Sequence, residues 1–366
     1  MQPSRHRNRS LGRPTTACVL GCLLASCTVV GPTAMRNGRL AYNEAIIETE
    51  NQQMLLLVVR SRYGERSNLL SVASVTANVS ITASTGVELG FGDDDSYAGN
   101  LVPFGAGVTY EENPTISYTP VGGERYARQL MSPVPVGALA QLTGTRINPE
   151  LIYNTLVASV NGIRNPDFLA KPTEADPRFS RFVTIMTELK RTHHLRWIED
   201  SEQAGRFSLV IEHYAPDLAA EVQELLRLLG LSAPQQSSSR IVLPVRLALQ
   251  GHEAGEVALD TRSVYDLLEI LAGAVDVPER DRASGVAMDY PPPGAAAAEL
   301  RIRWTEAEPD TASVAVHYRG GWFYIDDRDQ STKQFFRMLG TLLSVAMAEG
   351  NGTGASAPVL TVPVSR

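Results

Sequence analysis

Histidine and acidic residues that lie close together are the first candidates for metal or acid–base chemistry in this chain. His252-Glu253-Ala254-Gly255-Glu256 begins like the H-E-x-x-H motif of zinc proteases, but it ends in glutamate and contains a glycine. Because that motif needs one helical face to present both ligands, the segment does not predict a zinc site. His193 and His194 are adjacent, so their side chains diverge, and we expect them to cap the C-terminus of a helix.

Acidic residues gather at two predicted turns. Asp326-Asp327-Arg328-Asp329 separates a predicted strand from a predicted helix, and we expect Asp329 or Ser331 to accept hydrogen bonds from the first free amides of that helix. A calcium ion needs six to eight oxygen ligands, which one short turn rarely supplies. Asp93-Asp94-Asp95 is expected to be the solvated tip of a hairpin. The acidic groups therefore predict no metal site.

The motifs of several common enzyme classes are missing from the sequence. It has no G-x-S-x-G elbow, no S-x-x-K pair and no glycine-rich phosphate loop between a strand and a helix. Glu212-His213-Tyr214 is expected to end a strand at the surface. We therefore predict no catalytic residue and no bound cofactor.

One segment does predict covalent chemistry. Arg5, Arg7, Arg9 and Arg13 precede a short apolar stretch that leads to Leu24-Ala25-Ser26-Cys27. This order is typical of a secretory signal peptide, and the apolar stretch is too short to span a bilayer. Its last four residues look like the lipobox of a bacterial lipoprotein. We therefore predict that residues 1–26 are removed and that Cys27 is lipidated.

Charge and cysteine content limit the possible partners. Four of the 33 basic residues and none of the 40 acidic residues precede Cys27, so cleavage changes the formal net charge from −7 to −11. A domain this acidic should be repelled by nucleic acid and by anionic membrane surfaces. Cys18 and Cys22 belong to the predicted leader, which leaves Cys27 alone and excludes a disulfide framework or a thiolate metal site.

The N-terminal part predicts a long helix followed by a long hairpin. After a tether at residues 27–33, a helix is expected over Leu40–Arg62, with apolar residues interrupted at Glu50-Asn51-Gln52-Gln53. This interruption is expected to be a partly solvated middle; alternatively, Asn51 faces a partner helix and fixes its register. The helix and hairpin are assigned to a domain at residues 34–165.

Strict alternation marks the two arms of the hairpin. Apolar or small residues occupy every odd position from Val75 to Phe91, and alternation resumes on even positions from Val102 to Tyr110. After a break at Asn113-Pro114 it continues through Ile116 and Tyr118. At about 3.3 Å per residue the first arm could reach roughly 55 Å. Either a bulge or bend near Gly86 folds it, or the hairpin projects from the body.

The C-terminal half, residues 174–366, predicts alternating helices and strands, so the fold class is α+β. A proline-rich segment at 165–177 is the expected boundary between the halves. A helix is expected over Pro149–Val160, and Pro244 suggests an edge position for the strand Ile241–Leu249. The other expected elements are a helix with apolar residues Phe179, Phe182, Val183, Met186 and Leu189, strands at 207–211, 300–304, 313–318, 322–325 and 359–364, and helices around 218–229, 264–271 and 335–346.

Four segments of the chain form a familiar set: Asn43–Gln53, Asn113–Pro120, Asn161–Asn165 and Tyr318–Asp329. Together they resemble an uncharacterised family of proteobacterial lipoproteins, over most of residues 27–366. The resemblance implies lipidation and a Gram-negative origin, and it implies no activity and no functional residue. Thr28 follows Cys27 in place of the aspartate that commonly retains lipoproteins at the inner membrane, so the resemblance implies an outer-membrane anchor facing the periplasm.

Three functions are compatible with this sequence. The first is a non-enzymatic envelope protein, tethered by the lipid on Cys27 and acting through a protein partner. The second is a subunit of an oligomeric outer-membrane channel to which each copy donates its hairpin, as curli-export-type lipoproteins do. The third is an enzyme or ligand-binding protein with a dispersed site. A homo-oligomer is compatible with the first two.

Overall fold

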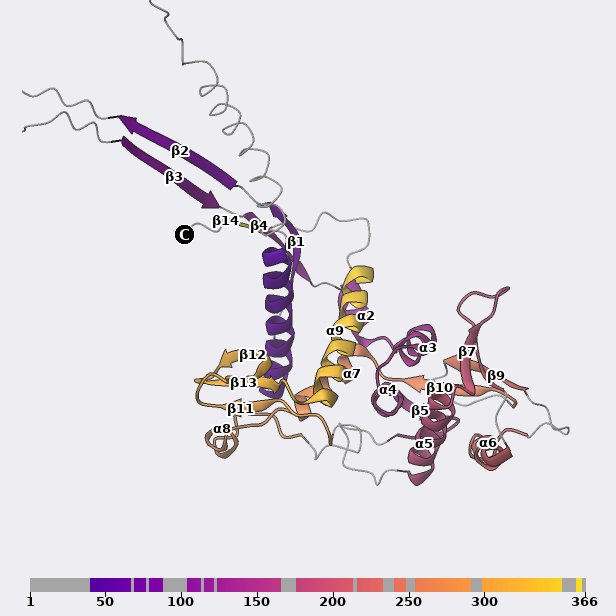
Figure 1. The fold of residues 1–366 in the computed structure, drawn as a ribbon. Coiled ribbons are helices and arrows are strands. Elements are labelled where there is room, and N and C mark those ends of the chain that lie inside the picture. Colours follow the sequence, from indigo (N-terminus) through magenta and orange to yellow (C-terminus); the bar gives the residue numbers. More distant parts are fainter. Residues whose placement is uncertain are drawn as a thin grey trace, which may run out of the picture. The chain divides into compact units, whose positions relative to one another are not determined.

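A computed structural model describes residues 40–66, 69–76, 79–87, 104–112, 115–121, 124–165, 176–212, 216–232, 240–247, 254–290, 298–350 and 360–363. The chain divides into two compact units, Met1–Gln52 and Gln53–Arg366. The second unit combines helices with mixed and antiparallel sheets, which confirms the predicted α+β class (Figure 1).

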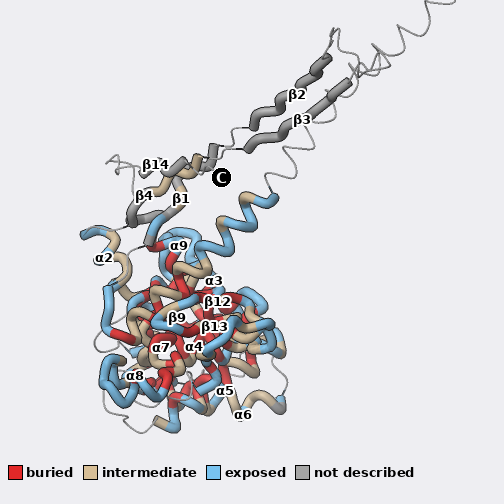
Figure 2. The backbone as a smooth tube through the Cα atoms, turned by 90° about the vertical axis from the view of Figure 1, so that its left-hand side faces the viewer, coloured by how far each residue is buried: buried red, intermediate tan, exposed pale blue. Residues whose placement is uncertain are grey.

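The predicted N-terminal helix is present over residues 40–62, but only part of its apolar face is buried. Leu40 and Ile47, in the first unit, are 72% and 50% exposed. Met54, Leu55 and Val58, in the second unit, are buried. The change from exposed to buried along this helix is visible in Figure 2. Its polar middle therefore separates an exposed segment from one that belongs to the core.

The largest sheet of the second unit has six strands. Their order is β6 (Ile163–Arg164), β5 (Val157–Val160), β10 (Val257–Thr261), β9 (Arg240–Leu247), β8 (Phe207–Glu212) and β7 (Leu195–Glu199). β9 and β10 run parallel, and the other neighbours run antiparallel. Burial alternates along β9, where Ile241, Leu243 and Val245 are buried, so one face of this sheet packs into the core.

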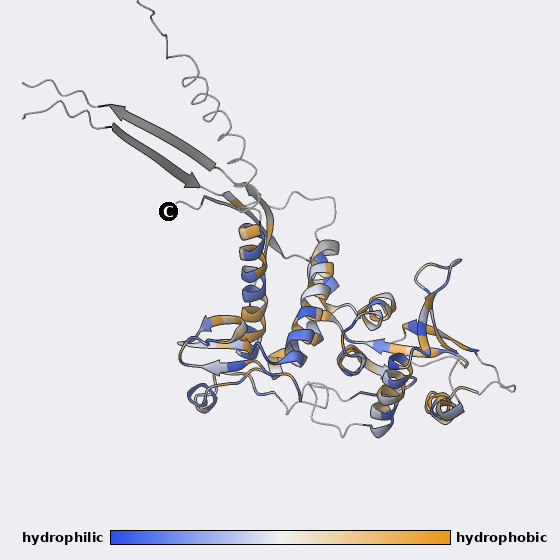
Figure 3. Ribbon diagram, viewed as in Figure 1, coloured by the Kyte–Doolittle hydropathy of each residue, from blue (hydrophilic) through white to orange (hydrophobic). Residues whose placement is uncertain are grey.

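Helices with a single apolar face pack around this sheet. They are α3 (Val136–Gly144), α4 (Pro149–Leu156), α5 (Pro177–Arg191) and α6 (Ala219–Leu228), which follows a short 3₁₀ turn at Pro216–Leu218. α5 packs against α4, α6 and β7. All five apolar residues predicted for α5 are buried. Figure 3 shows hydrophobic and hydrophilic positions along each of these helices.

A smaller antiparallel sheet and a second group of helices complete the body. The sheet has the order β11 (Arg303–Thr305), β13 (Gly321–Asp326) and β12 (Ala312–Tyr318). The helices are α2 (Glu124–Met131), α7 (Val264–Gly273), α8 (Glu279–Ala283) and α9 (Gln330–Gly350). α9 packs on α2, α7 and the N-terminal helix, where a Cβ added at Gly340 would lie 3.3 Å from Met54 Cε. α7, α9, β12 and β13 confirm the helices expected around 264–271 and 335–346 and the strands expected at 313–318 and 322–325.

The predicted long hairpin consists of two successive antiparallel pairs. β1 (Leu69–Thr76) pairs with β4 (Thr115–Val121), and β2 (Val79–Val87) pairs with β3 (Phe104–Glu112). The C-terminal strand β14 (Leu360–Pro363) adds to the other edge of β4. Of the two alternatives for the first arm, the described ladder has no bulge at Gly86, which pairs with Gly105, and the one irregularity in the described pairs lies between Val72 and Ser74.

The helix expected over Pro149–Val160 was wrong in its last turn. The helix α4 ends at Leu156, and residues 157–160 form β5. The β-branched residues Val157 and Val160 pair with β10, which outweighs their weak helical tendency. Asn161 and Gly162 have φ values of 45° and 77°, so they form a hairpin turn to β6 and do not end a helix.

The edge position expected from Pro244 was also wrong. β9 lies between β8 and β10, and Pro244 pairs with Ser208 of β8. The pairing of β9 with β10 begins only at Val245. Proline is accommodated because it lies in the part of the strand that has a neighbour on one side only.

The sheet and the core continue across the expected boundary at residues 166–173. β5 and β6, which precede it, share a sheet with β7–β10, which follow it. One hydrophobic cluster includes Leu139 and Tyr153 from before the boundary and Phe182, Leu267 and Phe335 from after it. The two halves therefore share one hydrophobic core in the described residues. Their assignment as two separate domains stays a prediction. Among the described residues, no helix combines the length and the apolar character needed to cross a membrane.

Candidate functional site

Several residues singled out from the sequence lie outside the described residues. They are Cys27 with its lipobox, Asp93-Asp94-Asp95, His213-Tyr214, and His252-Glu253. Glu212, which is described, ends β8 and forms ion pairs with Arg196 and Arg240. Glu256 forms an ion pair with Arg246. These described glutamates therefore act as structural partners of surface arginines.

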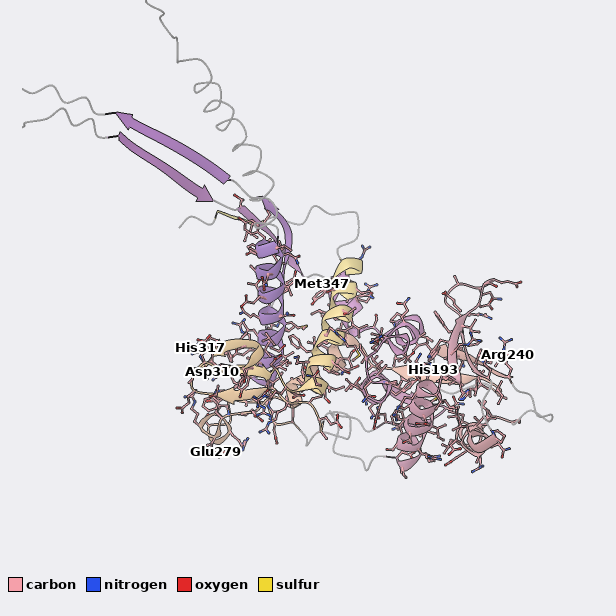
Figure 4. The ribbon with its side chains drawn as sticks, in the orientation of Figure 1. His193, Arg240, Glu279, Asp310, His317 and Met347 are labelled. Atoms are coloured by element: carbon pink, nitrogen blue, oxygen red, sulfur yellow. The ribbon has the colours of Figure 1, made fainter. Side chains whose placement is uncertain are left out.

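His193 and His194 end α5, as predicted, but the backbone forms the cap. The His194 N–H donates to Leu189 O (2.9 Å) and the His193 N–H donates to Lys190 O (3.2 Å). With a φ of 64° at His193, this is a Schellman motif, in which the residue after the C-cap is left-handed. Figure 4 labels His193 at this position and His317 on β12, where His317 packs against Trp322.

The acidic turn before α9 caps that helix. Asp329 accepts hydrogen bonds from the Thr332 N–H (2.9 Å) and from Thr332 Oγ1 (2.7 Å), as predicted for this residue. Asp326 accepts from the Arg328 N–H, and Asp327 pairs with Lys333. No group of three or more histidine, cysteine, aspartate or glutamate side chains in the described part of the chain could hold a metal ion.

Two groups of connected polar side chains lie where the N-terminal helix ends. We define the Tyr63 cluster as Tyr63, Glu65, Asp281 and Arg319. The buried Tyr63 hydroxyl donates to Asp281 Oδ2 (2.7 Å), and Arg319 Nη1 lies 3.0 Å from Glu65 Oε1. The Arg319 guanidinium lies 4.7 Å from the centre of the Tyr63 ring. The Tyr63 cluster therefore joins the N-terminal helix to α8 and to the β12–β13 hairpin.

The turn that positions Tyr63 requires a glycine. Gly64 has a φ of 67°, and the Glu65 N–H donates to Arg60 O (2.9 Å), which ends the helix in a second Schellman motif. A Cβ at Gly64 would also lie 3.1 Å from Met288 Sδ. Both the backbone conformation and the close approach of Met288 therefore favour glycine here.

A second cluster surrounds Glu269 of α7, and we define it as Ser61, Arg62, Glu269 and Tyr290. Ser61 Oγ donates to Glu269 Oε1 (2.6 Å), and the Tyr290 hydroxyl donates to Glu269 Oε2. The Arg62 guanidinium lies over the Tyr290 ring, 4.7 Å from its centre. The Glu269 cluster thus joins the same helix end to α7 and to the segment after α8.

The electrostatics of both clusters favour structural hydrogen bonds. Burial, followed by the hydrogen bond to Asp281, raises the pKa of Tyr63 above its ordinary value. Burial, followed by the hydrogen bond to Glu269, raises the pKa of Tyr290. Both phenols therefore stay protonated and donate at neutral pH.

Arg62 is the one member of these clusters with buried donors that lack an acceptor among the described residues. Its Nε and Nη1 atoms are buried without a hydrogen bond there. Burial lowers the pKa of Arg62. Since both nitrogens are covered by protein atoms, this arrangement does not provide an open binding site.

A third polar group lies inside the core at the junction of α4 and β5. The buried Arg262 Nη1 donates to the backbone oxygens of Asn154 (3.0 Å), Thr155 (2.9 Å) and Val157 (3.3 Å). Asn165 Nδ2 donates to Asn154 O and Val157 O, both at 2.7 Å. These side chains satisfy carbonyl groups that the end of a helix leaves without intrahelical partners.

Sequence reasoning did not identify the residues of these three groups. Glu269 carried one weak signal, because it lies between Leu268 and Ile270 in an apolar helix. Tyr63 and Asp281 are 218 residues apart, and Arg319 lies in the turn between β12 and β13. No local sequence pattern therefore connects these three residues. Arg262 follows a strand, and the carbonyl groups to which it donates lie more than 100 residues earlier in the chain. Their roles depend on tertiary packing.

Comparison with known proteins does not add a function to this geometry. No protein-family model, no curated protein and no solved structure matches the chain. The argument for a function therefore rests on the residues and the geometry described above.

Proposed function

We propose that this chain is an envelope lipoprotein of a Gram-negative bacterium, anchored in the outer membrane by the lipid on Cys27 and facing the periplasm. Its role is non-enzymatic, and it acts through contacts with protein partners. The observation that best supports this role is the continuous helix at residues 40–62, which begins shortly after the proposed anchor and ends in the Tyr63 and Glu269 clusters.

The length of the intervening segment defines how close this helix lies to the membrane. Twelve residues, 28–39, separate Cys27 from Leu40. Fully extended, such a segment spans at most about 45 Å. The helix therefore begins within this distance of the bilayer, and Leu40 and Ile47 form an exposed apolar face available to a partner.

The polar clusters fit the second part of the proposal. Ser61, Tyr63 and Glu65 each have a hydrogen bond or an ion pair to a different element of the body. Residues 61–65 at the end of the helix are therefore joined to α7, α8 and the β12–β13 hairpin. We expect this arrangement in a helix that connects the body to a membrane anchor, and not in an enzyme active site.

Metabolic labelling with a fatty acid tests the anchor. Wild type is expected to incorporate label and to fractionate with the outer membrane, whereas Cys27→Ser is expected to lose both. Cys22→Ser is the matched control, because this residue lies in the proposed leader and its replacement should leave the label in place. Label retained in Cys27→Ser would overturn the anchor.

Site-specific photo-crosslinking tests the contact surface. A photoreactive residue at Ile47 is expected to give one or a few defined adducts in cells, and the same residue at Thr184, exposed on α5, is expected to give none. An adduct pattern that is identical at both positions, or the absence of adducts at Ile47, would contradict a partner on the helix.

A second function is favoured by the ribbon formed by β2 and β3. Each strand has nine residues, and transmembrane β-strands are about 9–11 residues long. Apolar or small residues alternate with polar residues or glycine along β2 and along β3 as far as Tyr110. We therefore keep the outer-membrane channel subunit as the second candidate. Conductance of the purified protein in planar bilayers tests it, and a protein that inserts without conductance would exclude it.

A further inference from the structure

The β2–β3 ribbon is regular but has no third strand among the described residues. Nine consecutive residue pairs join Val79–Val87 to Phe104–Glu112 without a register shift. The sheet is two-stranded, so one edge of β2 and one edge of β3 are left without a described strand. A two-stranded ribbon is marginally stable in water by itself, and further strands or packing are needed to hold it.

The register of the ribbon places its apolar positions together. Ile81 pairs with Tyr110, Ala83 pairs with Val108, and Val87 pairs with Phe104. Directly paired residues share one face of an antiparallel sheet. The polar positions, such as Thr82 and Thr109, pair in the same way. The register therefore places mostly apolar or small residues on one face from the Ile81–Tyr110 pair to the Val87–Phe104 pair, with Thr85 opposite Ala106, whereas Val79 pairs with Glu112 at the start of the ribbon.

The two open edges lack the features that normally prevent strand addition. Natural proteins protect sheet edges with charged residues, prolines, bulges or very short strands. β2 contains no charged residue and no proline, and β3 contains no charge before Glu111. The other described sheet edges differ from these two. β7 has Arg196 and Glu199, β6 has two residues, and β14 has four residues including Pro363. β1 and β12 contain no charged residue and no proline, but their ladders are interrupted between Val72 and Ser74 and between Ala312 and Val314.

We propose that the open edge of β2 pairs with the open edge of β3 from a second copy of this chain. The two edges differ, so the contact is head to tail and each copy can bind two neighbours. Strands then follow one another as β2, β3, β2, β3 around a ring, and every neighbouring pair is antiparallel. The partner in this pairing is a second copy of the chain. Only the role of the ring rests on the proposed channel function.

The alternation also restricts the register between copies. If odd residues of β2 lie opposite even residues of β3, as within one chain, a single apolar face continues through all copies. A shift of one residue would place apolar positions opposite polar ones and break this face. The proposal therefore predicts which residues of two chains meet: even positions of β2 with odd positions of β3.

Cysteine crosslinking in the full-length, lipidated protein tests this pairing. Two differently tagged forms are co-expressed, one with Ser80→Cys, Thr82→Cys or Ser84→Cys in β2 and the other with Thr109→Cys in β3. Because the chain has no other cysteine after Cys27, a bond between the two tags reports contact between two copies. Three β2 positions are scanned so that register shifts of two residues in either direction are covered.

The expected result is a heterodimeric crosslink for at least one of the three mixtures, at least tenfold above the level for Thr184→Cys paired with Thr109→Cys. Each single variant expressed alone should not crosslink to itself. Self-crosslinking of single variants would overturn the head-to-tail contact in favour of a two-fold one. No crosslink in any mixture, with the protein monomeric by mass, would overturn self-association.

The outcome is independent of channel activity. A positive crosslink without conductance would retain the pairing and exclude the channel, whereas loss of the pairing would remove the structural basis for both. Far-UV circular dichroism and unfolding temperature of each cysteine variant verify that the body is folded before the crosslink is scored.

Discussion

Strand β9 of the six-stranded sheet and the strands of the β2–β3 ribbon have similarly alternating sequences, but they differ in what lies next to them. β9 buries Ile241, Leu243 and Val245 within a core to which helices α4, α5 and α6 also contribute. β2 and β3 have no third strand in the described part of the molecule. Alternation therefore specifies an apolar face, while the elements that follow along the chain decide what covers that face.

This difference separates two sources of stability. The body obtains its stability from one core shared by segments far apart in sequence, so single substitutions there should have large effects. The ribbon contributes strand edges, so its removal should change association and leave the body unchanged. The following substitutions test this division, beginning with the largest expected effect.

Replacement of Phe182 by alanine is expected to destabilise the body most. Phe182 is 1% exposed on α5 and packs against Tyr153 and Phe179. Deletion of a buried aromatic ring typically costs about 3–5 kcal/mol of unfolding free energy. Urea unfolding measures this loss. Thr184→Ala, two residues further on the exposed side, should change stability by less than about 0.5 kcal/mol.

Replacement of Arg262 by alanine should cost about 2–3 kcal/mol, because three backbone carbonyl groups lose a donor inside the protein. Arg262→Lys should recover part of this loss, since one ammonium group can reach some of the same oxygens. Urea unfolding of the two variants provides the comparison. Equal stability of Arg262→Ala and wild type would show that the junction of α4 and β5 does not depend on this side chain.

Tyr63→Phe should cost about 1–2 kcal/mol near neutral pH, because Asp281 loses a buried donor. It should also change the response to alkaline pH. The pKa of Tyr63 is raised in the folded protein, so its contribution is fully present below the unfolded value near 10 and is lost as the pH rises above that value. Urea unfolding at pH 8 and pH 11 should show a smaller loss for the variant than for wild type.

Tyr324→Phe is the matched control for this measurement. Tyr324 lies on β13, in the hairpin whose turn contains Arg319 of the Tyr63 cluster. It should leave the alkaline loss of stability close to that of wild type. If both variants reduce the loss equally, the alkaline response does not arise from the Tyr63 cluster.

Deletion of the ribbon should have the smallest effect on the body. Thr76 and Thr115 are register partners, so residues 77–114 can be replaced by an Asn-Gly turn that joins β1 to β4 directly. The unfolding temperature of the body should change by no more than about 2 °C, since this is the scale of a 0.5 kcal/mol change. A large decrease, measured by circular dichroism, would show that the ribbon belongs to the body.

Elements in which the local hydrophobic pattern matches the buried face could be predicted from the sequence. Phe179, Phe182 and Leu189 recur at helical spacing and are buried as expected. β12 and β13 lie close to the strands expected at 313–318 and 322–325, and the two-residue turn between them has positive φ at Arg319 and Gly320. In these cases local periodicity and tertiary burial agree, so the pattern alone is sufficient.

Elements that depend on distant partners were not predictable in the same way. Residues 157–160 continue an apolar helical pattern and become a strand only because β10, a hundred residues later, offers a ladder. The joining of Ser61 to Glu269 and of Tyr63 to Asp281 requires pairs of residues more than 200 positions apart. A single sequence contains no local signal for such pairs, whereas the lipobox around Cys27 is a local signal by nature.

The mass of the mature, lipidated protein in mild detergent tests the central claim most directly, that the ribbon associates with other copies while the body folds within one chain. Wild type should have the mass of a multimer, and the variant with residues 77–114 replaced by Asn-Gly should be a folded monomer. A monomeric wild type, or a deletion variant that keeps the wild-type assembly, would contradict the account.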